Sequence, residues 1–354
     1  MASYYWVVLV LACTCALSGA LAARDLADDA SMAARHEQWM GKYGRVYGDA
    51  AEKARRLEAF KANVAFNEST NAGNSKFWLE ANQFADITED EFRATHTGYK
   101  PVAVTNKGRS TGFRYANASL DDLPASVDWR TNGAVTPIKD QGQCGCCWAF
   151  STVASMEGIV KLSTGKLVSL SEQELVDCDD TDKGCEGGLM DNAFEFVVKN
   201  SGLATEADYP YTGADGSTCD SSTAAATITG HEDVPANDEA SLLKAVAAQP
   251  VSLAVDGGDN LFRFYKGGVL SGACGTQLDH GIAAVGYGVA GDGTKFWVMK
   301  NSWGAGWGED DFIRMERDVA DKQSLCGLAM LPFLPHGVAS CFIPILLACK
   351  SIHL

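Results

Sequence analysis

Three cysteines within four positions form the stretch of this sequence most able to do chemistry. Cys144, Cys146 and Cys147 lie in residues 141–151, and an apolar, helix-compatible run follows from Trp148. A cysteine at the start of a helix lies beside unpaired backbone N–H groups and the positive end of the helix dipole, which favour its thiolate. A thiolate nucleophile is therefore one interpretation, and a disulfide cluster in a secreted protein is the other.

A thiol nucleophile needs a base that takes its proton, a group that orients this base, and hydrogen-bond donors for the oxyanion. His280 lies 133 residues after Cys147, Asn301 lies 154 residues after it, and Gln141 precedes it by six. Taken alone, His280 is one of six histidines and a structural role is the more common one, Asn301 suits a plain turn, and Gln141 indicates nothing. What distinguishes the three residues is the sequence around them.

Four motifs surround these residues in order along the chain. They are Gln141-Gly142-Gln143-Cys144-Gly145-Cys146-Cys147-Trp148-Ala149-Phe150-Ser151, Gly184-Cys185-Glu186-Gly187-Gly188, Asp279-His280-Gly281, and Asn301-Ser302-Trp303-Gly304 with Trp307-Gly308-Glu309. With these motifs the chain resembles precursors of papain-like cysteine proteases of the cathepsin L type, and looks like a plant, senescence-associated one. The resemblance extends from the N-terminus to about Leu331.

The resemblance implies a role for each residue. Cys147 is similar to the family's nucleophile and His280 to its base, with Asn301 orienting the imidazole under the cover of Trp303. Gln141 and the backbone N–H of Cys147 are expected to bind the oxyanion. A buried thiolate–imidazolium pair can lower a thiol pKa from about 8.5 to below about 4. The implied activity is that of a cysteine endopeptidase; peptide ligation by the same acyl-enzyme remains open.

The resemblance also implies a substrate groove. Gly187 and Gly188 resemble the strip whose backbone pairs with an extended peptide, and glycine permits that close approach. An apolar side-chain pocket is expected beside it, which predicts a preference for a hydrophobic residue two positions before the scissile bond. The remaining substrate-binding positions are Leu189, Met190, Ala254, Leu278, Asp279 and Leu331.

The other cysteines are expected to form disulfides. The resemblance implies the pairs Cys144–Cys185, Cys178–Cys219 and Cys274–Cys326, a pairing that the sequence itself does not decide. Cys146 is left over, either as a small buried side chain, which we favour, or as a redox-sensitive neighbour of Cys147. The spacing of the cysteine cluster matches no common zinc site, so we expect neither a metal nor another cofactor.

Composition and charge place the chain among soluble globular proteins. Apolar residues make up 46% and charged residues 21% of its 354 residues, and the net charge of −16 argues against nucleic acid or an anionic membrane as a partner. Residues 1–122 carry 14 Lys and Arg against 15 Asp and Glu, whereas the remainder carries 15 against 30. This change in charge indicates a boundary near Leu123.

The domain organisation follows from this boundary. Residues 1–23 have a short apolar core and an Ala20-Leu21-Ala22 cleavage pattern, which predicts a signal peptide; a membrane anchor is the alternative, but the core is shorter than the roughly 20 residues required. Residues 24–122 resemble an inhibitory propeptide that ends in an extended linker from residue 98. Residues 123–335 form the predicted peptidase domain, and residues 336–354, with Cys341 and Cys349, form an atypical tail. Asn67 and Asn117 begin glycosylation triplets.

The elements that would position these residues are helices first and strands later. Helices are predicted after Ser31 and Asp49, from Cys147, after a Ser171–Glu174 capping box, after Gly188 and after Asp238. Strands are predicted over residues 251–255, 281–287, 295–300 and 312–317. This order predicts an α+β fold of the papain-like kind. Such a fold has a helical lobe and an antiparallel β-barrel-like lobe with the active-site cleft between them, preceded by a helical propeptide.

Three residues depart from the family pattern. Asn67 stands where an apolar residue is usual, Glu80 where glycine is usual, and Asp311 where a glycine would permit a positive φ. Glu80, Asp311 or the tail leaves open a catalytically weakened storage or binding protein on the same fold.

The expected biology follows the resemblance. We expect a monomer made as a precursor in the secretory pathway, destined for a vacuole or lysosome-like compartment or the extracellular space. Its partners would be protein and peptide substrates, its own propeptide and cystatin-type inhibitors. Acid would loosen the propeptide, and cleavage near Leu123 would free an enzyme of protein degradation.

Overall fold

The computed structural model describes residues 29–73, 76–100, 112–216, 218–219 and 223–339. They form two compact units: the first comprises the chain up to Phe66 with Ala85–Ile87, and the second comprises Asn67–Phe84 and the chain from Thr88. The predicted signal peptide and the cysteines Cys341 and Cys349 lie outside the described residues. Of the helices within these ranges, none is both long enough and apolar enough to cross a bilayer.

The first unit is helical, and its second helix continues past Phe66 into the second unit. Residues 29–43 form one helix, and α2 (Ala50–Ala72) begins after Asp49, whose Oδ1 accepts a hydrogen bond from Glu52 N at 2.7 Å. The predicted start at Ser31 is wrong, because residues 29 and 30 are already helical. Trp39, Phe60 and Val64 are buried, as expected for the apolar faces of the two helices.

The helices of the second unit are α3 (Glu89–His96), α4 (Cys147–Thr164), α5 (Glu172–Cys178), α6 (Met190–Lys199), α7 (Glu239–Ala248) and α8 (Asn260–Arg263), with short 3-10 helices at Leu120–Asp122, Gly184–Glu186 and Leu325–Gly327. Helices α4 to α7 begin where the sequence indicates, whereas α3 and α8 were not predicted. Ser171 caps α5 through Glu174 N at 3.0 Å. The predicted capping box is only half formed, because the Glu174 carboxylate accepts instead from Ala204 N and Asn200.

A nine-stranded sheet forms the rest of the second unit. Its strands are β1 (Phe77–Leu79), β2 (Val127–Asp128), β3 (Thr227–Asp233), β4 (Val251–Val255), β5 (Tyr265–Leu270), β6 (His280–Val289), β7 (Lys295–Lys300), β8 (Phe312–Glu316) and β9 (Phe333–Ala339). The order is β1-β5-β8-β7-β6-β4-β9-β3, with β2 on β6, and every pairing except β5–β8 is antiparallel. The four predicted strands correspond to β4, β6, β7 and β8. Strand β9 continues past residue 335, where the predicted tail begins.

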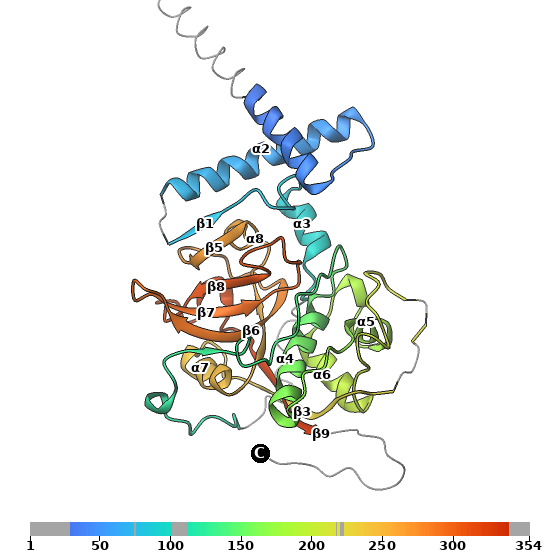
Figure 1. Ribbon diagram of the computed structural model, residues 1–354, viewed down its shortest axis with the longest axis vertical. Helices are drawn as coiled ribbons and strands as arrows, with labels where there is room; N and C mark the ends of the chain where they lie inside the picture. Colours follow the sequence, from blue (N-terminus) through green and yellow to red (C-terminus); the bar gives the residue numbers. More distant parts are fainter. Residues whose placement is uncertain (1–28, 74–75, 101–111, 217, 220–222, 340–354) are drawn as a thin grey trace, which may run out of the picture. The chain divides into compact units, whose positions relative to one another are not determined.

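Helices and sheet meet along α4 (Figure 1). Helix α4 packs on β6, and α6 packs on β3. Most of α4 is buried on every side, which is why its sequence is apolar around the whole helix rather than along one stripe. The α+β prediction is confirmed, with the refinement that the sheet contains one parallel pair.

Three disulfides fix the loops around this junction. They join Cys144 to Cys185, Cys178 to Cys219 and Cys274 to Cys326, the pairs that the resemblance implied. Among the described cysteines, Cys146 and Cys147 are free, and both are buried.

Candidate active site

Cys147 is the first residue of α4, and its thiol is completely buried. Burial raises its pKa to about 12, and the backbone N–H groups of Gly281, Gly98 and Tyr99 offset this shift only in part. The helix terminus was expected to lower this pKa. In the precursor, burial of the thiol acts in the opposite direction to this expected effect.

His280 and Asn301 meet at one edge of the sheet. His280 opens β6, Asn301 directly follows β7, and the antiparallel β6–β7 pairing brings these ends together. His280 Nε2 lies 2.7 Å from Asn301 Oδ1. Since an amide oxygen only accepts, Nε2 carries the proton and Nδ1 is the free base atom. Nδ1 has no hydrogen-bond partner in the described part of the chain, and burial lowers the pKa of the ring to about 4.

Trp303 covers the imidazole. Its ring stacks on His280 with 4.4 Å between ring centroids, and it is 3% exposed. Phe84 and Phe92 pack edge-on against Trp303 at 5.4 and 5.1 Å. The His280–Asn301 hydrogen bond is thereby kept from water.

Gln141 is held in place from several sides. Its Nε2 donates to Cys144 O at 2.9 Å, and Ser302 Oγ donates to its Oε1 at 2.7 Å. The Tyr211 hydroxyl donates to its backbone oxygen at 2.7 Å and lies 3.0 Å from Cys146 Sγ. Ser302 and Tyr211 are supporting residues that the sequence analysis missed. Ser302 lies within a recognised motif but was given no role there, whereas Tyr211 lies 70 positions from Gln141 and belongs to none of the motifs.

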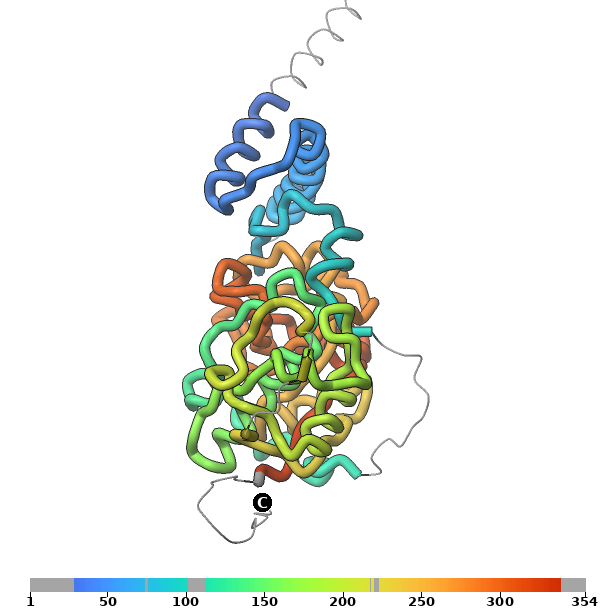
Figure 2. The backbone as a smooth tube through the Cα atoms, turned by 90° about the vertical axis from the view of Figure 1, so that its right-hand side faces the viewer, coloured from blue at the N-terminus to red at the C-terminus, as the bar shows by residue number. Residues whose placement is uncertain are grey.

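Residues 98–100 pair with Gly188, a residue of the predicted substrate groove, through a parallel bridge between Tyr99 and Gly188. In Figure 2 the backbone tube is cyan at these residues. Gly188 N donates to Gly98 O at 2.9 Å, and Lys100 N donates to Gly188 O at 3.3 Å. Asp279 O accepts from the N–H groups of Gly98 and Tyr99. The predicted linker therefore begins as a strand-like segment paired with the groove, and its part over residues 101–111 lies outside the described residues.

The close approach of the two backbones requires glycine at two positions. A Cβ on Gly187, whose φ is +116°, would lie 2.4 Å from Gly98 O, so only glycine permits this approach. A Cβ on Gly98 would lie 1.7 Å from Gly145 O. The segment and the groove are thus in direct backbone contact.

The side chain of Tyr99 lies in the hydrophobic cluster that contains the predicted apolar pocket, whose residues are Leu189, Met190, Ala254, Leu278 and Leu331. Tyr99 is 4% exposed and belongs to the same buried cluster as Met190, Ala254 and Leu278, against which Leu189 and Leu331 pack. Burial and the nearby carboxylate of Asp191 raise the pKa of the Tyr99 phenol. The structure therefore brings together all five predicted pocket residues, with a side chain of the preceding segment among them.

Hydrogen bonds to His96 and ion pairs of Arg93 also hold this segment. His96 O accepts from Gln141 Nε2 and from Trp303 Nε1, each at 3.3 Å. From α3, Arg93 forms ion pairs with Asp279 and, at 3.0 Å, with Asp256. Burial raises the pKa of Asp279 to about 6, and Arg93 opposes this shift. The sequence analysis did not identify Arg93.

Asp311 adopts the conformation that its position suggested. Its φ is +62°, its backbone oxygen accepts from Asn301 N at 2.9 Å, and its Oδ1 accepts from Trp303 N at 2.9 Å. The carboxyl is buried, which raises its pKa well above the ordinary value, and its Oδ2 has no partner among the described residues. The positive φ that a glycine would permit at this turn is present, and Asp311 adopts it.

The two glycosylation predictions differ in outcome. Asn67 lies within α2 and is 4% exposed, a position that disfavours a glycan on the folded chain. Neither polar atom of its side chain has a hydrogen-bond partner within the described ranges. Asn117 is exposed, and its glycosylation stays a prediction.

Comparisons with known proteins agree with this geometry. Residues 123–336 match the family model described as papain family cysteine protease, and residues 36–92 match the cathepsin propeptide inhibitor domain (I29). The chain is similar to the senescence-specific cysteine protease SAG39 of Oryza sativa subsp. indica, with 67% identity over 92% of this chain and 96% of that protein. Its identity to the senescence-specific cysteine protease SAG12 of Arabidopsis thaliana is 53%, over 88% of this chain and 92% of that protein.

A solved structure shows the same architecture. The recombinant stem bromelain precursor superposes with a TM-score of 0.78 at 43% identity, covering 86% of this chain and 99% of that chain. A precursor of known structure thus shares the architecture that carries this site. The chain belongs to the papain family of cysteine proteases and carries the family's inhibitory propeptide.

Proposed function

We propose that Cys147, His280, Asn301 and Gln141 carry out peptide-bond hydrolysis through an acyl-enzyme. His280 Nδ1 takes the proton of the Cys147 thiol, and the thiolate attacks the substrate carbonyl carbon. Gln141 Nε2 and the Cys147 backbone N–H bind the resulting oxyanion. His280 then protonates the departing amine, and a water molecule, deprotonated by His280, releases the acyl group from sulfur.

The observation that carries this proposal is the peptide already in the groove. Gln141 Nε2 donates to a peptide carbonyl oxygen, His96 O, as it would donate to the oxyanion. The backbone of Gly98 and Lys100 pairs with Gly188, as an extended substrate would. The site therefore already binds peptide backbone at both places that the mechanism requires.

Occupation of the apolar cluster by Tyr99 supports the proposed specificity. We expect a hydrophobic or aromatic residue two positions before the scissile bond to be preferred. A positional library of peptide substrates measures this preference through kcat/KM. An optimum at arginine in that position would contradict the proposal.

The same contacts support an inactive precursor. Residues 96–100 block the groove, and burial raises the pKa of the Cys147 thiol and lowers the pKa of the His280 imidazole, which favours the neutral form of each. We propose that acid, followed by cleavage near Leu123, removes this segment and permits the thiolate–imidazolium pair to form. Activation at acidic pH would suit an enzyme of protein degradation in a vacuole, a lysosome-like compartment or the extracellular space.

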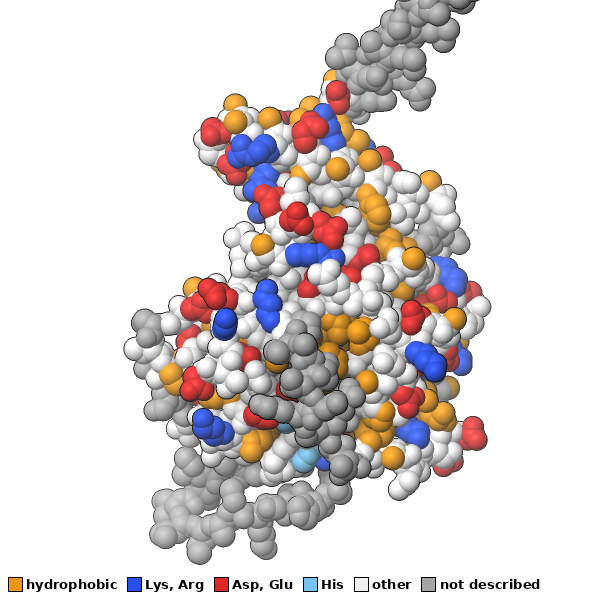
Figure 3. All heavy atoms as spheres, turned by 180° about the vertical axis from the view of Figure 1, so that it is seen from behind, with side chains coloured by type: hydrophobic (Ala, Val, Ile, Leu, Met, Phe, Trp, Pro, Cys, Tyr) orange, Lys and Arg blue, Asp and Glu red, His pale blue; other side chains and the backbone are white. Residues whose placement is uncertain are grey.

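The expected partners are peptides and proteins rather than nucleic acid. On the face shown in Figure 3, blue side chains are scattered among red ones and do not merge into a basic tract. With the groove vacated, cystatin-type inhibitors would compete with substrates for it, and we propose that the enzyme acts as a monomer.

Covalent labelling tests this function. An epoxide that traps activated thiolates should label the acid-processed chain but not the intact precursor at neutral pH. Labelling should be lost in Cys147→Ala and retained in Cys146→Ala. A processed wild-type chain that resists the epoxide would favour the alternative, a weakened storage or binding protein, for which the buried Asp311 beside Asn301 is the structural argument.

A further inference from the structure

Two aspartates lie against the glycine strip of the substrate groove, and the mechanism above uses neither of them. Asp182 Oδ1 accepts hydrogen bonds from Leu189 N at 3.1 Å and from Asn192 Nδ2 at 2.8 Å. A Cβ placed on Gly188 would lie 2.6 Å from Asp182 Cγ, whereas a Cβ on Gly187 would lie 2.4 Å from a backbone oxygen of the groove segment. Gly187 thus faces the peptide in the groove, and Gly188 packs on the Asp182 side chain.

Residues 182 and 183 hold the strip on both sides of Gly188. Lys183 N donates to Gly187 O at 3.0 Å, and Leu189 N donates to Asp182 Oδ1. Gly188 itself pairs with the peptide segment through both its N–H and its oxygen. A displacement of Asp182 is therefore transmitted to a residue that binds peptide with both of its backbone groups.

Asp179 is the partner of Asp182. It is 5% exposed, its Oδ1 accepts from Thr181 N at 3.0 Å, and its carboxyl lies within hydrogen-bond reach of the Asp182 carboxyl. The Oδ2 atoms of both aspartates are buried and have no donor elsewhere in the described residues. Because a carboxylate only accepts, the two carboxyls can bond to each other only when one of them carries a proton. One shared proton therefore provides the donor that the pair lacks.

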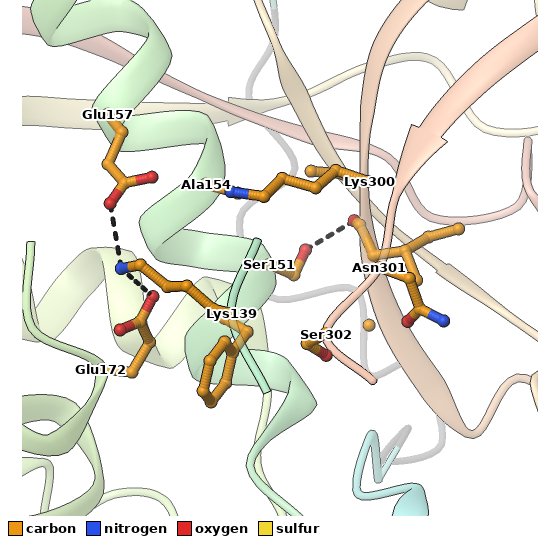
Figure 4. Close-up of a pocket in the computed structure, with 12 residues that line it drawn as sticks. Lys139, Ser151, Ala154, Glu157, Glu172, Lys300, Asn301 and Ser302 are labelled. Carbon is orange, nitrogen blue, oxygen red and sulfur yellow. Dashed lines mark hydrogen bonds and ion pairs between the residues drawn. The ribbon is translucent and has the colours of Figure 1, made fainter. Parts of the chain in front are cut away.

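A cation does not take the place of this proton. The buried carboxylates of Glu157 and Glu172 show the alternative, since Lys139 Nζ lies 3.1 and 2.6 Å from them (Figure 4). In the described part of the chain, no ion pair of this kind reaches Asp179 or Asp182. Without the proton, two negative charges would meet uncompensated.

The neighbouring elements do not supply a buried positive charge either. Helix α6 contributes Asp191, a further carboxyl that repels that of Asp182, and α4 contributes the uncharged Trp148, which lies next to Gly188. The charged side chains of the loop and of the groove segment are exposed, namely Asp180, Lys183 and Lys100. Water and salt screen exposed charges, so the surroundings favour the protonated pair.

The proton is held in acid and lost near neutral pH. Burial raises the pKa of Asp182 to about 7, and the charge of Asp179 adds to this shift, against the hydrogen bonds from Asn192 and Leu189. Burial raises the pKa of Asp179 as well. As the pH rises through about 7, the pair gains a second negative charge, and the two carboxylates repel each other next to Gly188.

We propose that Asp182 is a positioning residue for the substrate, and that the proton it shares with Asp179 holds Gly188 in the geometry that binds peptide. Loss of this proton drives the carboxylates apart and shifts the strip that residues 182 and 183 hold, so the substrate binds less tightly. The reacting groups of Cys147 and His280 are not involved. This inference deepens the proposed function and rests on it, since the same groove binds the substrate.

The kinetics of the processed enzyme with a peptide amide, measured between pH 5 and pH 8, test the positioning role. KM of the wild type should rise about fivefold as the pH passes 7, the effect of one weakened hydrogen bond, and kcat should not share this step. Asp182→Asn should keep the low KM at pH 8, because its amide still accepts from Leu189 N and donates to Asp179 without a titrating proton. Asp182→Ala should raise KM at every pH.

Asp180→Asn is the matched control, because it removes a charge at an exposed position of the same loop and should reproduce the wild-type profile. An equal rise of KM in the wild type and in Asp182→Asn, or a step confined to kcat, would overturn the inference and leave the protease function intact. A processed wild-type enzyme that cleaves no peptide would overturn both.

The shared proton is tested apart from activity, on the full-length chain carrying Cys147→Ala. Adding Asp182→Asn should raise the urea midpoint of unfolding more at pH 8 than at pH 4. The native aspartate holds its proton above the unfolded pKa, so the wild-type residue loses stability as the pH rises towards 7, and asparagine does not. Equal shifts at the two pH values would overturn the shared proton.

Discussion

Asp311 combines two costly features at one residue, a left-handed backbone and a buried carboxyl. Its pKa in the folded chain lies above the unfolded value, so the native state binds more protons between the two values. The stability of the chain therefore falls as the pH rises through this window. The residue is best tolerated in acid, where it is protonated.

We predict that Asp311→Asn stabilises the protein at pH 7 and has little effect at pH 4. Asparagine tolerates the left-handed conformation and keeps the acceptor for Trp303 N, but it carries no charge. The free energy of unfolding at pH 7 should rise by about 1 kcal/mol, which is at the lower end of the cost of burying an unsatisfied polar group. Urea unfolding at the two pH values measures it. Asp310→Asn is the matched control, because Asp310 also has a positive φ but is exposed; an equal gain there would contradict the explanation.

Cys146 is the buried cysteine that the mechanism does not use. Its thiol lies 3.0 Å from the Tyr211 hydroxyl, and burial raises its pKa, so it remains a thiol. We predict that Cys146→Ser retains kcat/KM within about threefold, which corresponds to roughly 0.6 kcal/mol, because a serine hydroxyl can make the same contact. Cys147→Ser, measured in parallel, should lose nearly all activity. A comparable loss in both variants would mean that Cys146 takes part in catalysis.

At the scale of elements, α2 carries a polar residue in a buried position. Asn67 is 4% exposed, and its side chain has no partner within the described ranges. We predict that Asn67→Leu raises the free energy of unfolding by about 1–2 kcal/mol, because it removes a desolvation cost and favours the helix. Thermal unfolding of the precursor measures the change.

Asn71, four residues later on α2, provides the contrasting control. Its side chain donates to Leu79 O and accepts from Leu79 N, at 2.9 and 2.8 Å. Asn71→Leu should therefore destabilise the precursor. If both substitutions shifted the stability in the same direction, the contrast between a paired and an unpaired amide would fail.

The elements that hold the nucleophile and its base could be predicted from the sequence. Helix α4 and strands β4, β6 and β7 have strong local patterns, and the motifs mark where Cys147 and His280 fall on them. Strands β3 and β9 were not predicted. Their mixture of polar residues, glycine and proline has no regular alternation, and they form because each supplies the other with backbone partners.

The residues that hold the site in place were also harder to predict, because they depend on partners far away in the sequence. Arg93 and Tyr211 act through partners that lie 186 and 70 positions away. Only the folded chain brings these groups together, since no local periodicity encodes a contact at such separations. The half-formed capping box is a similar case, because tertiary contacts to Ala204 and Asn200 replaced the local bond of Glu174.

At the scale of the whole molecule, Tyr99 connects the propeptide to the specificity pocket. We predict that Tyr99→Ala in the full-length precursor speeds self-processing at mildly acidic pH. Replacing a buried aromatic residue by alanine typically costs about 3–5 kcal/mol, and here this loss weakens the bound segment. The rate of appearance of the processed chain on a gel measures the effect.

Tyr99→Phe should process nearly as slowly as the wild type, because it keeps the buried ring and lacks only the hydroxyl. Equal rates for the wild type and both variants would show that backbone pairing with Gly188 holds the segment without help from the pocket. If both variants were processed faster than the wild type, the Tyr99 hydroxyl would be the group that contributes most to holding the segment.

The segment in the groove and the enzyme that it blocks are parts of one polypeptide. An inhibitor tethered in this way acts at an effective local concentration that dilution cannot change. Latency of the precursor should therefore be independent of how much of it is present. Once the chain is cut, the freed segment becomes an ordinary bimolecular ligand whose occupancy falls as the solution is diluted. A single covalent break thus converts a concentration-independent block into a reversible one, and the same contacts give lasting inhibition before cleavage and temporary inhibition after it.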